Sequence, residues 1–266
     1  MTSLSAATGN RGYIVPFLTI GSVFVAANLI ASKLNHIDDT DETYGYYEPL
    51  HYLLYGVGMQ TWEYSPFYAI RTYTFITPFL ALGSLLKSLN FSKLDIFYGI
   101  RISLGLLAAT SETFYVSAIY DNFGKTVGDM TLLFMLFSSG VLYTSTALLP
   151  SAVIMSLVML ACASLLQRRY LLVILIGCIS VLWSGWPFVG IIYLPFGMHI
   201  IAETCKMTSD DTKKVATSED NTTYKALKRV CSLCVKGAII LTSVAGSAAA
   251  VDFYMYNRRY TDECAA

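Results

Sequence analysis

The stretch MTLLFMLFSSGVLYTSTALLPSAVIMSLVMLACASLLQ, residues 130–167, contains no charged side chain. Two further uncharged runs cover residues 12–32 and 170–202. About 20 apolar residues are enough for a helix to cross a bilayer, and a soluble protein has no use for runs of this length in tandem. The three runs therefore predict an all-α polytopic membrane protein.

The composition of the whole chain agrees with this class. Of 266 residues, 55% are hydrophobic and 14% are charged, about half the usual charged share, and the mean hydropathy is +0.54. A net charge of zero gives no basic surface that would indicate nucleic-acid binding. The six cysteines do not form a secreted disulfide pattern, because Cys162 and Cys178 lie inside apolar runs and the Cys231/Cys234 pair has no second pair.

We expect a single transmembrane domain over residues 1–266, with a loop at 33–71 after an uncleaved first span and a basic polar loop at 203–228. Proline breaks helices, so Pro150 and the Gly185-Trp186-Pro187 trio are expected breaks. The spans are expected at 13–32, 73–89, 95–119, 127–148, 150–167, 170–202 and 229–251.

The distribution of lysine and arginine predicts the orientation. Residues 34–70 contain six acids and no basic residue except histidine, whereas residues 203–228 contain five lysines. Because cytoplasmic loops are rich in lysine and arginine, the acidic loop is predicted to be luminal and the basic loop cytoplasmic. This requires 170–202 to cross once, and a hairpin at Trp186-Pro187 would move the basic loop to the lumen.

Two sequons bear on the orientation, because only a luminal asparagine receives a glycan. A glycan on Asn221, in Asn221-Thr222-Thr223, would exclude a cytoplasmic basic loop. Asn90, in Asn90-Phe91-Ser92, is expected at the cytoplasmic end of the second span and therefore unmodified.

The acidic loop contains the segment DETYGYYEPLHYLLYGVGMQTWEYSP, residues 41–66. Glu48-Pro49 predicts a helix start, since proline suits the first helical position, and Gly56 and Gly58 predict its end. Leu50, Leu53, Leu54 and Val57 follow a helical spacing and make one apolar stripe. We expect an amphipathic helix lying on the membrane, with Tyr and Trp at headgroup depth.

Four acids occupy five positions just upstream, at Asp38, Asp39, Asp41 and Glu42. Carboxylates this close raise one another's pKa, and one explanation for that cost in stability is a general base or a metal site at the membrane surface. The alternative is a solvated acidic loop that only sets the topology. The residues alone suit an enzyme acting on a lipid-linked polar substrate, or a transporter of lipid headgroups.

Other polar residues have two interpretations each. Arg71 could hold a phosphate or could be an interfacial side chain that reaches toward water. Glu112 lies in a predicted span, where acids default to functional hypotheses, although a pair with Arg101 or a place near a span end is equally allowed. Asp252 and Arg258 would be luminal in the predicted orientation.

Several motifs together resemble one family. They are Asp41-Glu42-Thr43-Tyr44, the 47–56 segment YEPLHYLLYG, the 60–66 segment QTWEYSP and Ala69-Ile70-Arg71, with further likeness at 111–114, 138–140, 145–151, 185–188 and 251–254. In combination they resemble the dolichyl-phosphate-mannose-dependent α-1,2-mannosyltransferases of asparagine-linked glycan assembly, in glycosyltransferase family 22. The likeness covers nearly the whole chain, and enzymes of this family are roughly twice its length, so it implies the N-terminal half.

The resemblance implies a GT-C transmembrane bundle in the endoplasmic reticulum membrane, with the catalytic acid in the first luminal loop. The partners it implies are dolichyl-phosphate mannose as donor, a dolichol-diphosphate oligosaccharide as acceptor, and the lipid bilayer. A β-linked donor and an α-linked product require one inverting base, expected at Asp41, with Glu42 or Asp39 as alternatives. No metal or other cofactor is expected. The expected substrate-binding residues are His51, Glu48, Trp62, Glu63, Arg71, Glu112, Asp252 and Arg258.

Two alternatives remain from the sequence. One is a mannosyltransferase of glycolipid-anchor assembly, against which the EPLHYLLYG and QTWEYSP segments argue. The other is a non-catalytic membrane subunit that binds or transports lipid-linked sugars.

Overall fold

A computed structural model describes residues 14–213 and 219–265, with side chains described over 17–206 and 227–258. All regular structure in these ranges is helical, which confirms the predicted fold class. The chain divides into two compact units, Met1–Gln60 with Phe79–Leu166 and Thr61–Pro78 with Gln167–Ala266. Four described helices are long and apolar enough to cross a membrane: Phe17–Leu34, Lys93–Phe123, Pro187–Lys206 and Leu227–Arg258.

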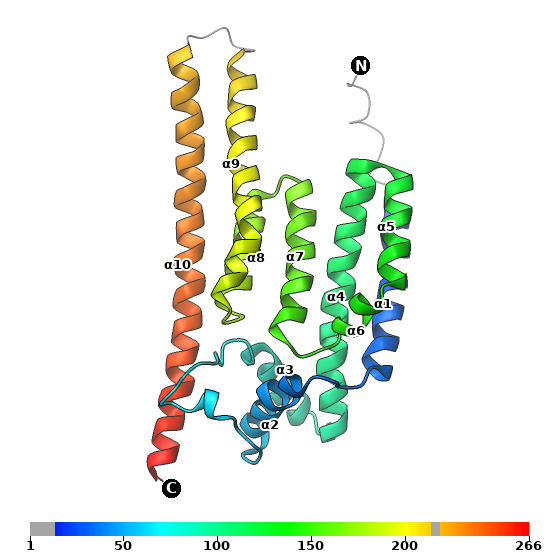
Figure 1. Cartoon of the computed structure of the whole chain (residues 1–266), viewed down its shortest axis with the longest axis vertical. Helices are drawn as coiled ribbons and strands as arrows, with labels where there is room; N and C mark the ends of the chain where they lie inside the picture. The colour runs from blue at the N-terminus through cyan, green and yellow to red at the C-terminus, as the bar shows by residue number, and fades with distance from the viewer. Residues whose placement is uncertain (1–13, 214–218, 266) are drawn as a thin grey trace. The chain divides into compact units, whose positions relative to one another are not determined.

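The first unit is built around α4 (Lys93–Phe123), against which α1 (Ile14–Leu34), α5 (Lys125–Phe137) and α7 (Pro150–Leu166) pack (Figure 1). A capping box begins α4, because the Ser92 hydroxyl accepts from the Asp95 N–H and the Asp95 carboxylate accepts from the Ser92 N–H. At its other end, Gly124 has a φ of 85° that ends the helix. This long, capped helix is the scaffold against which the acidic loop packs.

The acidic loop folds into a helical turn followed by the predicted helix. A π-helical turn, η1 (Glu42–Tyr47), leads into α2 (Glu48–Tyr55), which has its proline in the first turn. Gly56 ends α2 with a left-handed φ of 75°, so both expected boundaries are confirmed.

The apolar stripe of α2 faces protein where we expected it to face the membrane. Leu50 and Leu54 are buried, and Leu54 packs on Gly83 of α3 (Thr77–Ser88). Val57 lies beyond the helix and is 60% exposed. The prediction that this stripe faces the membrane is therefore wrong for Leu50 and Leu54. The spacing of these residues indicates only that one face of the helix is apolar. Such a face can pack against protein as well as against lipid.

Helix α3 differs from the span expected over residues 73–89. It has 12 residues, so it is about 18 Å long, short of the ~30 Å hydrocarbon layer. The Lys87 ammonium donates to the Leu54 carbonyl at 2.5 Å, which fastens the C-terminal end of α3 to α2. This end of α3 therefore lies beside the acidic loop.

The expected span over 127–148 is also divided. The 13-residue α5 ends before Ser138, whose hydroxyl accepts from the Val141 N–H and begins the six-residue α6 (Ser139–Thr144). A serine with extended backbone at this position interrupts the helix although no charge marks the break.

The second unit contains α8 (Tyr170–Leu182), α9 (Gly190–Lys213) and α10 (Glu219–Ala265), with α8 and α9 both packed on α10. The 170–202 run forms two helices, because the chain turns at Gly185, with a φ of 72°, and at the short η3 (Pro187–Val189). The expectation that this run crosses once as a single span is therefore wrong. Relative to the expected spans, the hairpin adds one crossing and the short α3 removes one, so the basic segment is still expected on the side opposite the acidic loop. The Ser180 and Tyr193 hydroxyls lie 2.7 Å apart across this hairpin.

The basic segment expected as a loop over 203–228 is largely helical. Helix α9 continues to Lys213 and α10 begins at Glu219, while residues 214–218 lie outside the described part. The side chain of Asn221, on which one sequon depends, also lies outside the described residues.

Candidate active site

The four clustered acids occupy different environments. Asp38 and Asp39 are exposed, Asp41 is partly buried, and Glu42 is 3% exposed. Asp41 directly precedes η1, and its backbone N–H donates to the Asp39 carboxylate at 2.8 Å. The solvated-loop alternative therefore holds for two of these acids, whereas the other two are built into the helical turn.

Glu42 is held from two sides inside the first unit. Its carboxylate accepts from the Leu148 N–H at 2.9 Å and lies 3.8 Å from the Arg101 guanidinium. Burial raises the pKa of Glu42 above its usual value, the Leu148 hydrogen bond and Arg101 oppose that rise, and the nearby Asp39 adds to it. This carboxylate is already engaged by protein groups, which suits an anchoring role.

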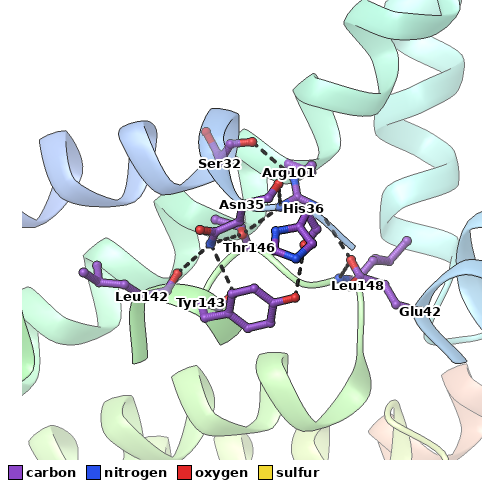
Figure 2. Close-up of polar contacts among 9 residues, drawn as sticks. All are labelled: Ser32, Asn35, His36, Glu42, Arg101, Leu142, Tyr143, Thr146 and Leu148. Carbon is purple, nitrogen blue, oxygen red and sulfur yellow. Dashed lines mark hydrogen bonds and ion pairs between the residues drawn. The ribbon is translucent and has the colours of Figure 1, made fainter. Parts of the chain in front are cut away.

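Arg101 is the centre of the network that holds this turn, as Figure 2 shows. Its side chain is 1% exposed. It donates to the Ser32 carbonyl at 3.1 Å, the Asn35 carbonyl at 3.0 Å and the Thr146 hydroxyl at 3.2 Å. This one buried cation of α4 therefore joins the end of α1 to the segment after α6.

Asn35 extends the same network. Its amide donates to the Leu142 carbonyl at 3.0 Å and the Thr146 hydroxyl at 3.1 Å, and the Tyr143 hydroxyl donates to the His36 carbonyl at 3.2 Å (Figure 2). These bonds fix the backbone on which the acid cluster stands.

Sequence reasoning did not assign Arg101 to the site and considered it only as a partner for Glu112. That pairing is wrong. The Glu112 carboxylate accepts from the Asn28 amide at 2.8 Å, and both side chains are buried between α1 and α4. An arginine inside a predicted span was the available signal, since such a cation must find buried partners. Glu112, eleven residues further along the chain, was the wrong choice of partner.

A small cavity of about 260 Å³ lies between η1, α2 and the first turns of α4. Its polar lining includes Glu48, His51 and Lys93. The Glu48 carboxylate accepts from the Met59 N–H at 3.0 Å, so it shapes the loop after α2.

Lys93 is the cationic side chain of this cavity, and His51 lies beside it. The Nδ1 of His51 lies 2.8 Å from the Val57 carbonyl, and because a carbonyl only accepts, Nδ1 carries the proton. The Nε2 of a neutral ring is then an acceptor for the Lys93 ammonium, 3.5 Å away. Lys93 also lies 4.4 Å from the centre of the Tyr55 ring. The sequence analysis missed Lys93, which carries no motif.

The second unit holds the rest of the predicted loop residues. Arg71 and Glu63 form an ion pair at 2.6 Å. The Asp252 carboxylate of α10 accepts from the Thr72 hydroxyl at 2.6 Å and the Thr74 N–H at 2.9 Å. Asp252 therefore fastens the end of the loop to α10.

Exposed aromatic side chains gather on the same segment. Trp62 is 60% exposed and meets Tyr68 edge-on at 5.2 Å, and Phe67 is 86% exposed. Arg258 is exposed on α10, one and a half turns beyond Asp252. Side chains of this kind are common at membrane surfaces.

The predicted site residues thus form two groups, one in each unit. The first unit holds Asp39, Asp41, Glu42, Glu48, His51 and Glu112, and the second holds Trp62, Glu63, Arg71, Asp252 and Arg258. Within the first group, Glu112 sits apart in its own contact with Asn28. Among the described residues, no three histidine, cysteine, aspartate or glutamate side chains are arranged to hold a metal ion.

The described helices and the folded acidic loop are those of an α-helical membrane protein, and comparison with known proteins identifies its class as the membrane glycosyltransferases of GT-C type. Residues 19–262 match the Alg9-like mannosyltransferase family, and the chain belongs to this family.

Curated relatives give the same result. The chain is similar to α-1,2-mannosyltransferase Alg9 of Drosophila melanogaster, at 39% identity over 69% of this chain and 29% of the relative. Its similarity to the protein of the same name from Schizosaccharomyces pombe is 38% over 68% of this chain and 32% of the relative. The Arabidopsis thaliana protein of that name is 30% identical over 95% of this chain and 39% of the relative.

The chain spans about a third of the length of these relatives. No solved structure matches it significantly.

Proposed function

We propose that this protein transfers mannose from dolichyl-phosphate mannose to a dolichol-diphosphate oligosaccharide, forming an α-1,2 linkage in the assembly of asparagine-linked glycans. The observation that carries the proposal is the family match over residues 19–262. The curated relatives named above are α-1,2-mannosyltransferases, which favours this linkage over glycolipid-anchor assembly.

Asp41 is the proposed general base. In the reaction the acceptor hydroxyl gives its proton to this carboxylate, and the hydroxyl oxygen forms a bond to C1 of mannose. The C1–oxygen bond to dolichyl phosphate breaks on the opposite side, and the phosphate leaves with the electron pair. A base must reach the acceptor, and Asp41 is the member of the cluster that is built into the turn while keeping solvent access.

The two alternatives within the cluster fit the role less well. Glu42 is buried against Leu148 and Arg101, so an acceptor hydroxyl would have to displace protein contacts. Asp39 is exposed and accepts from the Asp41 N–H, which suits a residue that shapes the turn. Arg101 is a positioning residue in this account, since it holds Glu42 next to the proposed base.

Each unit carries features suited to the donor. In the first unit, the Lys93 ammonium next to His51 is a cationic group that would bind a phosphate in the small cavity, while the Glu48 carboxylate in the same lining is held by the Met59 N–H. In the second unit, exposed Trp62, Phe67 and Tyr68 suit contact with the lipid-water boundary, where the dolichyl chain enters the bilayer.

The proposed location is the endoplasmic reticulum membrane, with the acidic loop in the lumen. In the first unit, α2, the end of α3 and the start of α4 are in mutual contact. These segments therefore lie on one side of the membrane, and that side includes Asn90. Asn90 then shares the side of the acidic loop, in contrast to the expectation from a membrane-crossing α3.

Transfer assays on membranes that contain the chain test the proposal. Membranes are incubated with labelled dolichyl-phosphate mannose and the acceptor lipid, and the product is treated with an α-1,2-specific mannosidase. We expect label in the oligosaccharide and its release by the enzyme. Label that resists this mannosidase would refute the linkage, and donor binding with no transfer would indicate the non-catalytic alternative.

A further inference from the structure

A second, larger cavity lies within the second unit. It has a volume of about 710 Å³ and is formed by the start of α8, by Thr204 of α9 and by one face of α10. Four cationic side chains line it, Arg168, Arg169, Arg229 and Lys236, and none of the lining residues is acidic.

The spacing of these residues builds a one-sided positive wall. Arg229 and Lys236 are separated by seven residues on α10, about two helical turns, and so lie on the same face. Arg168 adopts a left-handed φ of 58° and Arg169 directly precedes α8. No described carboxylate pairs with Arg168, Arg169 or Lys236. Like charges brought together repel, and a bound anion would relieve that repulsion.

The rest of the lining is apolar. Leu171 and Leu172 of α8 and Leu233 of α10 face the same space as the cations. Apolar walls add nothing to the binding of a free inorganic anion. A lipid would contact the cations with its phosphate and the leucines with its hydrocarbon chains. The cavity chemistry therefore specifies an amphiphile with an anionic head.

The position along α10 places this cavity at a membrane boundary. Arg229 and Asp252 are 23 residues apart in one helix, about 35 Å, close to the thickness of the hydrocarbon layer. Asp252 holds the end of the acidic loop, so the cations lie at the opposite membrane surface. Clustered basic residues favour the cytoplasmic surface, where anionic lipids are concentrated.

We propose that this basic cavity binds the phosphate headgroup of an anionic glycerophospholipid of the cytoplasmic leaflet. The ammonium and guanidinium groups would hold the phosphate, and the leucines would contact the first part of the acyl chains. The site is independent of mannose transfer.

Titration of the purified full chain with phosphatidylserine or phosphatidylcholine tests this, with thermal unfolding as the readout. We expect phosphatidylserine, and not phosphatidylcholine, to raise the unfolding temperature. The Arg168→Gln/Arg169→Gln variant should bind phosphatidylserine roughly 30-fold more weakly, given a loss of about fivefold per cation. The matched control Lys33→Gln/Lys125→Gln, which removes two exposed cations outside the cavity, should behave like wild type.

Three results would overturn the proposal. They are equal protection by both lipids, an unchanged phosphatidylserine affinity in the double arginine variant, and equal protection by inorganic phosphate, which would indicate a site for soluble anions. If the double arginine variant does not fold, Lys236→Gln against Lys125→Gln gives the same comparison, because both lysines are exposed.

Discussion

At the scale of single residues, Arg101 determines how the acidic turn is held. Its guanidinium is buried and bonded to three oxygen acceptors, with Glu42 as its counter-ion. A buried ion pair adds little stability over a well-packed apolar pair, but removal of one partner leaves an uncompensated charge and unsatisfied acceptors. Breaking this network is therefore expected to lower the stability of the fold strongly.

We predict that Arg101→Met lowers the free energy of unfolding by about 3–5 kcal/mol. Unfolding in mixed detergent micelles measures it, and Lys125→Met, at an exposed position, is the control that should change stability by less than about 0.5 kcal/mol. A loss below about 1 kcal/mol for Arg101→Met would show that the network does not support the fold.

The raised pKa of Glu42 predicts a pH dependence. Because the folded-state pKa lies above 4.5, the folded protein binds more protons than the unfolded chain between 4.5 and that higher value. Stability is then fully present below pH 4.5 and declines as the pH rises through the folded pKa. Melting temperatures measured from pH 4.5 upward should show this decline in wild type and a flatter curve in Glu42→Gln. Parallel curves would contradict the prediction.

At the scale of elements, the short helices are what the sequence analysis missed. Hydropathy identified α1, α4 and α7 well, since their ends coincide with charges, a capping serine and a proline. It could not show that residues 73–89 contain a 12-residue α3 bound to α2, because an apolar run reads the same whether protein or lipid covers it.

The candidate site also has features that local sequence predicts and features that it does not. Local patterns indicated the helix at Glu48-Pro49 and its end at Gly56, both of which depend on backbone preferences of single residues. The partners of Arg101 could not be predicted, because Ser32 and Thr146 come from distant parts of the chain and are bonded through a carbonyl and a hydroxyl. Charge pairing along the chain suggested Glu112 as the partner of Arg101. Only the packing of α1 against α4 shows that Glu112 is bonded to Asn28 instead.

The attachment of α3 predicts the side on which Asn90 lies. In a variant with all six cysteines replaced by serine, Asn90→Cys should react with an impermeant maleimide only after sealed microsomes are permeabilised. Lys125→Cys, beyond the other end of the 31-residue α4, is the control and should react without permeabilisation. Equal reactivity of both positions would mean that α4 does not separate them.

At the scale of the whole molecule, α10 connects two different surfaces. Its Asp252 holds Thr72 and Thr74, just after the acidic loop, while Arg229 and Lys236 line the basic cavity. Both sets belong to the second unit, so the helix itself fixes their separation. This supports the prediction that the end of the acidic loop and the basic segment lie on opposite sides of the membrane.

Labelling along the second unit tests that separation. In the same cysteine-free background, Tyr68→Cys should be protected in sealed microsomes and Lys228→Cys should be reactive, since both positions are exposed and lie toward opposite ends of the contacts with α10. Protection of both would place the basic segment on the same side of the membrane as Tyr68, which would contradict the predicted separation.

The central claim is that Asp41 is the base for mannose transfer, and one comparison tests it most directly. Membranes with wild type, Asp41→Asn or Asp38→Asn are supplied with labelled dolichyl-phosphate mannose and acceptor lipid, and initial rates are measured at equal protein levels. Asp38 is exposed and belongs to the same cluster, so it controls for local charge. We predict that Asp41→Asn lowers the rate at least about 100-fold and that Asp38→Asn stays near the wild-type rate. A rate for Asp41→Asn close to that of wild type would contradict the account.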